Sequence, residues 1–303
     1  MTRLNSVATA IAAAALLASS FVSADHHGGA HASSITKIDS NEFGIDAKEI
    51  ADIKAQMQAA VDGGFIAGNI LLVGNSEGVG VLETAGTQGP EQSTPMDEQT
   101  LFRIYSMTKP IVSVATMTLV EDGLLAISDP VSKYIPEFAN MTVINEETGA
   151  ITPAANEMTV QDLLTHESGL IYGIFDPRSE LGKMYFQAGS LRSDITALTL
   201  AQNLAALPLR FEPGTKWNYS RSTDVLGAVI EVAAGKPLDA LLNERIFAPL
   251  GMDETTFFVD VSKAARIAHP IHGEMADPTV VTPMLSGGGG LHSTTEDYVR
   301  FAS

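Results

Sequence analysis

The sequence predicts an α/β fold in which an antiparallel sheet is flanked by helices and followed by a mostly helical region. Three observations support this prediction. Helical periodicity begins at residues 47–61, two strand-like runs follow at residues 69–74 and 79–84, and the apolar spacing after residue 105 is mostly helical. Strands grouped in this way, with helices elsewhere, favour a sheet with helices packed against it.

The first helix and the hairpin have clear local signals. The helix ends before Gly63-Gly64 and carries four apolar side chains at helical spacing on one face: Ile50, Ile53, Met57 and Val61. Residues 75–78 join the two strand-like runs, so these runs predict an antiparallel hairpin near the N-terminus.

The later elements are delimited by caps and by proline and glycine. Thr159 and Asp162 form a capping box that starts a short helix ending at Leu164. Longer helices are predicted at residues 110–121, 195–207 and 224–234, and from Pro237 onward. A short strand is expected at residues 255–259, and residues 293–296 resemble a helix N-terminus. Because the chain stops at Ser303 after about two further turns, we expect a truncated protein.

The first 24 residues have the features of a secretory signal peptide. Arg3 supplies a positive start, residues 7–22 are apolar or small, and Val22-Ser23-Ala24 offers a cleavage site. That apolar run is shorter than the about 20 residues that a membrane span needs. We therefore expect an exported protein, periplasmic or secreted, with no stable membrane insertion after cleavage; the alternative is an uncleaved N-terminal anchor. Residues 25–42 are predicted to be a flexible linker, and residues 43–303 the folded domain.

Composition excludes several classes of protein. The chain has no cysteine, which rules out disulfide scaffolds, iron–sulfur clusters and cysteine-ligated zinc. Its formal net charge of −18 leaves no basic surface for a nucleic-acid backbone. Three linker histidines, His26, His27 and His31, lie among glycine, alanine and serine, which cannot fix the geometry of a metal site. We expect no metal and no organic cofactor, and the sequence does not indicate an oligomeric state.

Two serine motifs match catalytic patterns in the wrong context. Gly74-Asn75-Ser76-Glu77-Gly78 fits the G-x-S-x-G nucleophile elbow, which requires a strand-to-helix turn. Here a second strand follows, and Asn, Ser and Gly are ordinary hairpin-turn residues, so Ser76 is predicted to be structural. Ser34-Ile35-Thr36-Lys37 is an S-x-x-K motif in the predicted linker, where no helix would fix its geometry.

The strongest nucleophile candidate is Ser106 in Ser106-Met107-Thr108-Lys109, at the start of a predicted helix. Residues three apart on a helix are neighbours on one face, with Cβ atoms about 5–6 Å apart. The Lys109 amine can therefore reach the Ser106 hydroxyl, and desolvation favours its neutral, basic form. The helix N-terminus adds free N–H groups that favour a developing oxyanion. The alternative is a capping serine beside a solvated lysine.

Further segments accompany this motif along the chain. In order they are Phe102-Arg103-Ile104-Tyr105-Ser106-Met107-Thr108-Lys109-Pro110, Leu163-Leu164-Thr165-His166-Glu167-Ser168-Gly169-Leu170, Phe211-Glu212-Pro213-Gly214-Thr215-Lys216-Trp217-Asn218-Tyr219-Ser220, Asp224-Val225-Leu226-Gly227, Pro249-Leu250-Gly251-Met252, and Gly288-Gly289-Gly290-Leu291-His292-Ser293-Thr294. From about residue 45 to its end the sequence resembles the serine β-lactamase-related family: class C β-lactamases, D-alanyl-D-alanine carboxypeptidases and esterases on the same scaffold. It looks most like the esterase branch, the family VIII carboxylesterases.

The resemblance implies a fold and a set of site residues. The fold would be β-lactamase/transpeptidase-like, with a helical lobe at about residues 104–260, the site in the cleft between two lobes, and the C-terminal strands of the sheet missing. Ser106 matches the acylated nucleophile, Lys109 its activating partner, and Tyr219 the tyrosine of the second motif. A phenol is usable as a base near neutral pH only if a cation stabilises the phenolate. Lys109 and Tyr219 would titrate as a pair, so the identity of the base stays open. The alternative for Tyr219 is an aromatic wedge beside Trp217.

Two departures from the family pattern bear on function. The second motif usually reads Tyr-x-Asn, but its third position here is Arg221, which argues against β-lactams and peptides. The third motif, a Lys, His or Trp followed by x-Gly, does not occur after Tyr219, although its strand would supply the second oxyanion donor. Losing one such donor typically costs about 10²–10³ in rate. We therefore expect activity in the full-length parent rather than in this chain alone.

Histidine and glycine residues offer weaker alternatives. His166 is predicted to organise a loop by hydrogen bonding; a Ser–His–Asp arrangement would use His166, His269, His272 or His292, but no nucleophile elbow supports it. The glycines at residues 287–290 are not followed by Lys-Ser or Lys-Thr, so they predict a close backbone approach rather than a phosphate cradle.

These observations together predict a serine hydrolase that acts through an acyl-enzyme on a small ester or amide, most of all a carboxylesterase on short-chain esters. The alternative is a β-lactamase or D-alanyl-D-alanine carboxypeptidase. An alternative of another class is a non-catalytic binding protein on the same fold.

Overall fold

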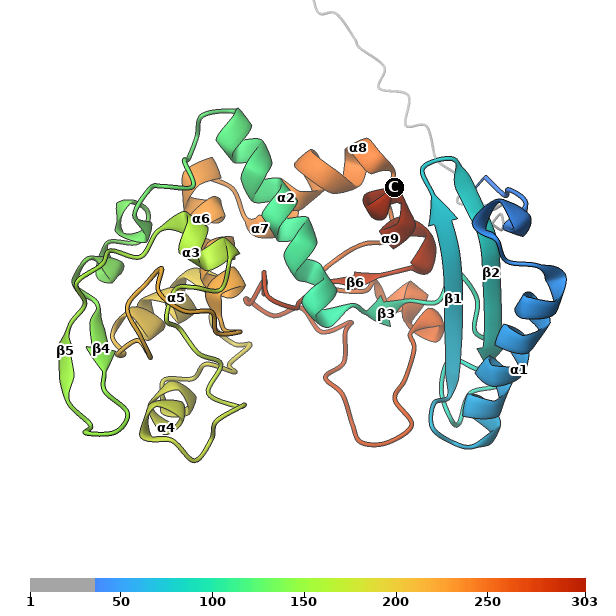
Figure 1. Cartoon of the computed structure of the whole chain (residues 1–303), viewed down its shortest axis with the longest axis horizontal. Coiled ribbons are helices and arrows are strands. Elements are labelled where there is room, and N and C mark those ends of the chain that lie inside the picture. The colour runs from blue at the N-terminus through green and yellow to red at the C-terminus, as the bar shows by residue number, and fades with distance from the viewer. Residues whose placement is uncertain (1–35) are drawn as a thin grey trace, which may run out of the picture. The chain divides into compact units, whose positions relative to one another are not determined.

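The N-terminal hairpin and its helix form as the sequence predicts. The computed structural model describes residues 36–303. Strand β1 (Gly68–Asn75) pairs antiparallel with β2 (Gly78–Gly86), with a register shift between Val73 and Gly74. Helix α1 (Ala47–Asp62) starts at a capping box formed by Asp46 and Glu49, and it packs along the hairpin, as Figure 1 shows.

Residues 36–43 are ordered, which corrects the predicted end of the linker. The Val79 amide donates to the Thr36 carbonyl at 2.8 Å, and the Ile38 amide donates to the Val79 carbonyl at 3.1 Å. A 3₁₀ helix, η1 (Ser40–Phe43), follows. The open edge of β2 offers unpaired backbone groups, and residues 36–38 satisfy them. The rest of the predicted linker, residues 25–35, and the predicted signal peptide, residues 1–24, lie outside the described part of the chain.

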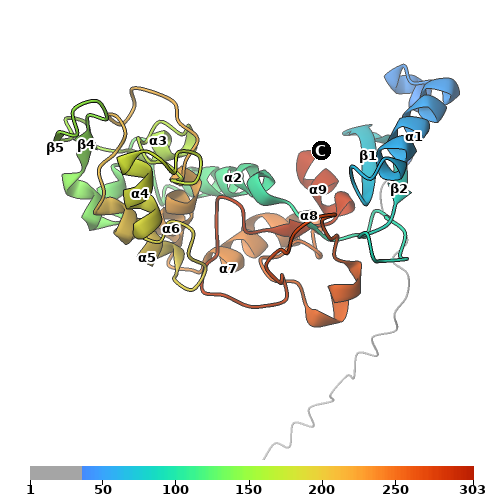
Figure 2. The same ribbon diagram turned by 90° about the horizontal axis from the view of Figure 1, so that it is seen from below.

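Helix α6 is the central element of the helical region. It spans Ser222–Ala234, and its residues 222–230 are all buried. It contacts α2 (Thr108–Glu121), α3 (Val160–Leu164), α5 (Ala197–Ala205) and α7 (Leu238–Leu242). Figure 2 shows α3, α5 and α6 gathered together from a second direction. The predicted helices in this region are thus confirmed, and they supply most of the apolar core.

Several shorter elements differ from the sequence predictions. The sequence did not indicate α4 (Glu180–Gln187) or the small antiparallel pair of β4 (Thr142–Ile144) and β5 (Ile151–Pro153). The strand predicted at residues 255–259 is wrong, because Thr256 makes only an isolated bridge with His292. Other short elements are the 3₁₀ helices η3 (Val131–Lys133), η4 (Pro136–Asn140) and η6 (Val261–Arg266), the π-helical turn η5 (Asn243–Phe247), and α8 (Ala248–Leu250).

The C-terminal residues are tied to the start of α2. Strand β3 (Phe102–Arg103) pairs antiparallel with β6 (His292–Ser293), and α9 (Thr295–Ala302) follows with Thr294 as its N-cap. The Ile104 amide donates to the Leu291 carbonyl at 3.0 Å. The Leu291 amide donates to Thr108 Oγ1 at 3.2 Å. Residues far apart in sequence thereby meet beside Ser106.

The described residues give an α/β fold built from helices and small antiparallel sheets, as the sequence predicts. Between residues 36 and 303, no helix combines the length and apolar character needed to cross a bilayer.

Replacing Leu119 tests the contribution of α2 to the core. Leu119 is 0% exposed, so Leu119→Ala is expected to lower the free energy of unfolding by about 2–5 kcal/mol through lost apolar contacts and a residual cavity. Met117→Ala on the exposed face of the same helix is the control and should change it by less than about 0.5 kcal/mol. Urea denaturation measures both; equal effects of the two variants would contradict this account of the core.

Candidate active site

The structure brings Ser106, Lys109 and Tyr219 together. Ser106 Oγ lies 2.5 Å from the Tyr219 hydroxyl, and Lys109 Nζ donates to Ser106 Oγ at 3.3 Å. The Lys109 ammonium also lies 4.7 Å from the centre of the Tyr219 ring. Tyr219 thus contacts Ser106, which lies 113 residues earlier in the sequence. The catalytic roles of the three residues stay predictions.

A strained backbone presents Ser106 at the start of α2. Ser106 lies in a 3₁₀ turn, η2 (Tyr105–Met107), and Lys109 lies in the first turn of α2 that continues from it. Tyr105 adopts φ = 41°, in the left-handed region that residues other than glycine rarely occupy. Strain of this kind persists only where surrounding contacts enforce it, and it clusters at functional sites.

Lys109 is buried and satisfies its donors within the protein. The exposed fraction of Lys109 is 9%. Besides Ser106, its Nζ donates to the Tyr172 hydroxyl at 3.2 Å and to the Gly288 carbonyl at 2.5 Å. An ammonium has three N–H donors, so these three acceptors match its capacity. Tyr172 has no signal in the sequence, because its place beside Lys109 depends on the packing of the loop that carries it.

The Tyr219 phenol has an environment suited to proton transfer. Burial raises its pKa, but interactions with the Lys109 ammonium and with Ser106 outweigh burial, so the pKa lies below its ordinary value of 10.0. By contrast, burial raises the pKa of the neighbouring Tyr172 phenol. The pKa values of the two phenols beside Lys109 are thus shifted in opposite directions. Tyr219, whose pKa is lowered, is the one that also contacts Ser106.

His166 holds the loop that carries Tyr219. The Ser220 amide donates to His166 Nδ1 at 3.3 Å, and the Asn218 amide donates to the His166 carbonyl at 2.9 Å. Its ring lies 4.8 Å from the Tyr219 ring. Burial, together with the Lys109 charge, lowers the pKa of His166 to about 4, so the imidazole is neutral at neutral pH. This arrangement agrees with the loop-organising role that the sequence predicts.

The other histidines do not form a Ser–His–Asp arrangement with Ser106. The hydrogen-bond partners of Ser106 Oγ in the described part of the chain are Tyr219 and Lys109. His269 lines a separate pocket, His272 lies in an exposed loop, and His292 belongs to β6.

Of the two serine motifs in the wrong sequence context, the structure describes the one that contains Ser76. Ser76 lies exposed in the hairpin turn, where the Asn75 side chain accepts hydrogen bonds from the Glu77 and Gly78 amides at 2.8 and 3.2 Å. The turn lacks the following helix that a nucleophile elbow requires. Ser34, from the S-x-x-K motif of the predicted linker, lies outside the described residues.

The glycines at residues 287–290 allow a close backbone approach, as predicted. A Cβ atom added at Gly287 would lie 2.5 Å from the Thr223 carbonyl oxygen, and one added at Gly288 would lie 2.6 Å from the Asp224 carboxylate. The turn therefore sits directly against the first residues of α6, which only glycine permits.

Arg221 stands where the family pattern has an asparagine, and its side chain contacts other protein groups. Its guanidinium forms a 3.0 Å ion pair with the buried Asp224 and lies 4.8 Å from the centre of the Tyr172 ring. The residue that departs from the family pattern is thus part of the packing around Lys109.

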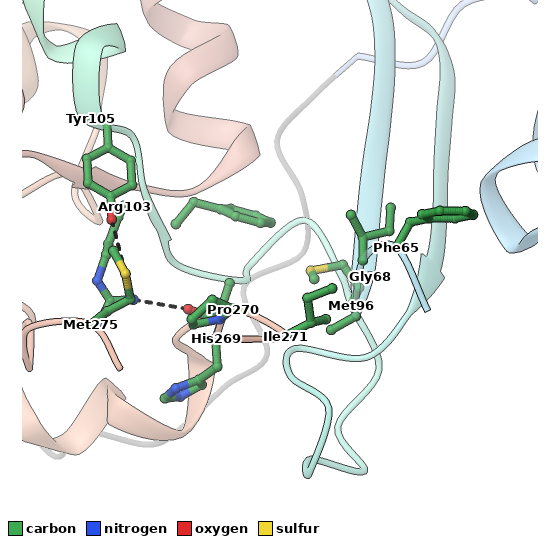
Figure 3. Close-up of a pocket in the computed structure, with 13 residues that line it drawn as sticks. Phe65, Gly68, Met96, Arg103, Tyr105, His269, Pro270, Ile271 and Met275 are labelled. Carbon is green, nitrogen blue, oxygen red and sulfur yellow. Dashed lines mark hydrogen bonds between the residues drawn. The ribbon is translucent and has the colours of Figure 1, made fainter. Parts of the chain in front are cut away.

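Two pockets lie beside the cluster rather than on it. The first cavity has a volume of about 360 Å³. It lies between the start of the N-terminal hairpin, with Phe65 and Gly68, and the segment that carries His269 and Met275, as Figure 3 shows. Tyr105 lines it, and the Tyr105 hydroxyl donates to Met275 Sδ at 3.8 Å. A second cavity of about 420 Å³ is lined by Tyr105, Arg221, Gly289 and neighbouring residues. Tyr105, the residue before Ser106, therefore borders both cavities.

Among residues 36–303, no group of three or more histidine and carboxylate side chains is arranged to hold a metal ion. The side chains of Ser106, Lys109 and Tyr219 bring a hydroxyl, an amine and a phenol to one point. Such an arrangement is suited to acyl transfer.

The chain is similar to known proteins in both sequence and structure. The Beta-lactamase family profile matches residues 53–303. Protein Rv1367c of Mycobacterium tuberculosis is 33% identical over 82% of this chain and 64% of its own length, and Esterase EstB of Burkholderia gladioli is 33% identical over 88% of this chain and 65% of its own length. The structure of EstCE1, a hydrolase with promiscuous acyltransferase activity, matches 84% of this chain and 70% of its own with a TM-score of 0.68 and 26% identity. The chain thus spans slightly less than two thirds of the length of these two curated relatives.

The titration of Tyr219 tests the electrostatics of the site. The difference in ultraviolet absorbance between the wild type and Tyr219→Phe isolates this phenol among the six tyrosines. We expect it to ionise below pH 10, and we expect Lys109→Met to move that ionisation to higher pH, because the phenolate loses its cation. An unchanged titration in Lys109→Met would show that the lysine does not stabilise the phenolate.

Proposed function

The chain belongs to the Beta-lactamase family, and we propose that it carries the catalytic centre of a carboxylesterase that hydrolyses short-chain esters through an acyl-enzyme. The observation that carries this proposal is the convergence of the Lys109 ammonium and the Tyr219 phenol on Ser106 Oγ. The substrate would be a small ester, and the reacting groups would be the side chains of Ser106, Lys109 and Tyr219 together with water.

The proposed reaction has two steps. In the reactive form the Lys109–Tyr219 pair has lost one proton, as an ammonium with a phenolate or as an amine with a phenol. Ser106 Oγ attacks the ester carbonyl while its proton passes to this pair, and the same proton then goes to the departing alcohol as the ester C–O bond breaks. Water next attacks the acyl-enzyme, gives up its proton to the pair, and releases the acid as Ser106 regains a proton. The Ser106 amide, in the 3₁₀ turn that leads into α2, is the available donor for the oxyanion.

Esters are favoured over β-lactams by two observations. Arg221 occupies the position where β-lactamases and peptidases usually have an asparagine, and its guanidinium is engaged by Asp224. Among the relatives, EstB is named an esterase and EstCE1 a hydrolase with acyltransferase activity. Both observations support the ester preference of the proposal.

Serine replacements in the native gene product test this function. Ser106→Ala is expected to lower the turnover of p-nitrophenyl butyrate by more than about 10³-fold, because the acyl-enzyme can no longer form. Ser76→Ala is the matched control at the decoy motif, and it should leave the turnover nearly unchanged because Ser76 lies in an exposed hairpin turn. The opposite pattern would defeat the assignment of the nucleophile.

Two other outcomes would favour the alternatives. Opening of a chromogenic cephalosporin without ester hydrolysis would point to a β-lactamase or D-alanyl-D-alanine carboxypeptidase. Failure of the native gene product to react with a fluorophosphonate at Ser106 would point to a binding protein that keeps the fold.

We also propose that the protein is exported, because residues 1–24 have the pattern of a signal peptide. N-terminal sequencing of the protein from the periplasm or medium is expected to begin at Asp25. Recovery of the chain in the cytoplasm with residues 1–24 intact would contradict this proposal.

A further inference from the structure

We propose that Asp224 is a positioning residue that holds Lys109 in place through the turn at residues 286–288; this inference rests on the proposed function for its kinetic consequences. Asp224 is 1% exposed. Within residues 36–303, the side-chain partners of Ser106 Oγ are Tyr219 and Lys109 rather than Asp224. A carboxylate buried so deeply needs partners that compensate for its lost hydration.

The first step in this argument is the contact between Asp224 and the turn. Asp224 Oδ1 accepts a hydrogen bond from the Gly288 amide at 3.1 Å and another from Ser286 Oγ at 2.5 Å. The turn approaches so closely that a Cβ atom at Gly288 would lie 2.6 Å from Asp224 Oδ2. The carboxylate therefore fixes both the distance and the orientation of the Gly288 backbone.

The second step leads from the turn to the lysine. The Gly288 carbonyl accepts from Lys109 Nζ at 2.5 Å, the shortest of the three hydrogen bonds that this ammonium makes. A lysine side chain has four rotatable bonds, so its ammonium stays near Ser106 only while fixed acceptors surround it. Because Asp224 orients the residue whose carbonyl binds Lys109, it controls one of those acceptors.

The third step concerns Arg221, which connects Asp224 to a second acceptor. Its guanidinium pairs with Asp224 Oδ2 at 3.0 Å and lies 4.8 Å from the centre of the Tyr172 ring. The Tyr172 hydroxyl in turn accepts from Lys109 at 3.2 Å. The Arg221–Asp224 pair thus contacts two of the groups that bind the ammonium, Gly288 and Tyr172. Arg221 has a structural reason to stand where the family pattern has an asparagine.

Asp224→Asn in the native gene product tests the proposal. The amide keeps the size of the carboxylate but removes its charge and weakens the pairing with Arg221 and with the Gly288 amide. We expect kcat for p-nitrophenyl butyrate to fall by about 10- to 100-fold with KM within about twofold, since a displaced catalytic group slows the chemical step rather than binding. The ionisation of the Tyr219 phenol should also move to higher pH as the ammonium shifts away.

Asp297→Asn is the matched control. Asp297 is also a buried carboxylate, at 2% exposure, but it accepts from the Glu254 amide and from Thr255, away from Lys109. This variant is expected to lose stability without changing kcat or the titration of Tyr219. If both variants lowered kcat equally, a general loss of stability would explain the effect and the proposal would be wrong.

Two further measurements keep the proposal decidable. If Asp224→Asn does not fold, Gly288→Ala replaces it, because the added methyl group does not fit against the Asp224 side chain and so separates it from the turn while keeping its charge. A folded variant of either kind with unchanged kcat and an unchanged Tyr219 titration would overturn the positioning role. If the wild type does not hydrolyse esters, the proposed function fails, whereas the Tyr219 titration still decides the role of Asp224.

Discussion

A buried ammonium determines the organisation of this site. Lys109 lies in the first turn of α2 with three acceptors around its Nζ: a serine hydroxyl, a phenol and a backbone carbonyl. A charge removed from water must be compensated by such groups, so each segment that supplies one is fixed relative to α2. The loop before α4, the turn before β6 and the nucleophile therefore all meet at one side chain.

The buried helix α6 supports the same arrangement. The turn at residues 286–288 packs against the first residues of α6, and the loop before this helix carries Tyr219. His166 holds that loop through two backbone amides, so the phenol approaches Ser106 on a constrained backbone. Rigid support of this kind is what proton transfer requires, because small displacements of a base or acid are costly to rate.

Local patterns predicted the local parts of this structure well. Capping residues and apolar spacing predicted α1, the hairpin, and the helices that surround α6, and the spacing of Ser106 and Lys109 predicted that they share a helix face. Tyr219 could be predicted only from the resemblance to a known family, because that resemblance rests on the order of motifs far apart along the chain. Tyr172 and the contact from Asp224 to Gly288 had no local signal, because they depend on loops that meet only after the core is packed. Strands of two residues, such as β3 and β6, are too short to give a periodic pattern.

The backbone of Tyr105 has a consequence for protein engineering. Its left-handed φ of 41° directly precedes the nucleophile, and its side chain borders two cavities. Glycine and asparagine accept this conformation with little strain, whereas valine, isoleucine and threonine do not. A library that randomises this position to reshape the cavities would therefore recover few β-branched replacements, whatever their fit to a ligand.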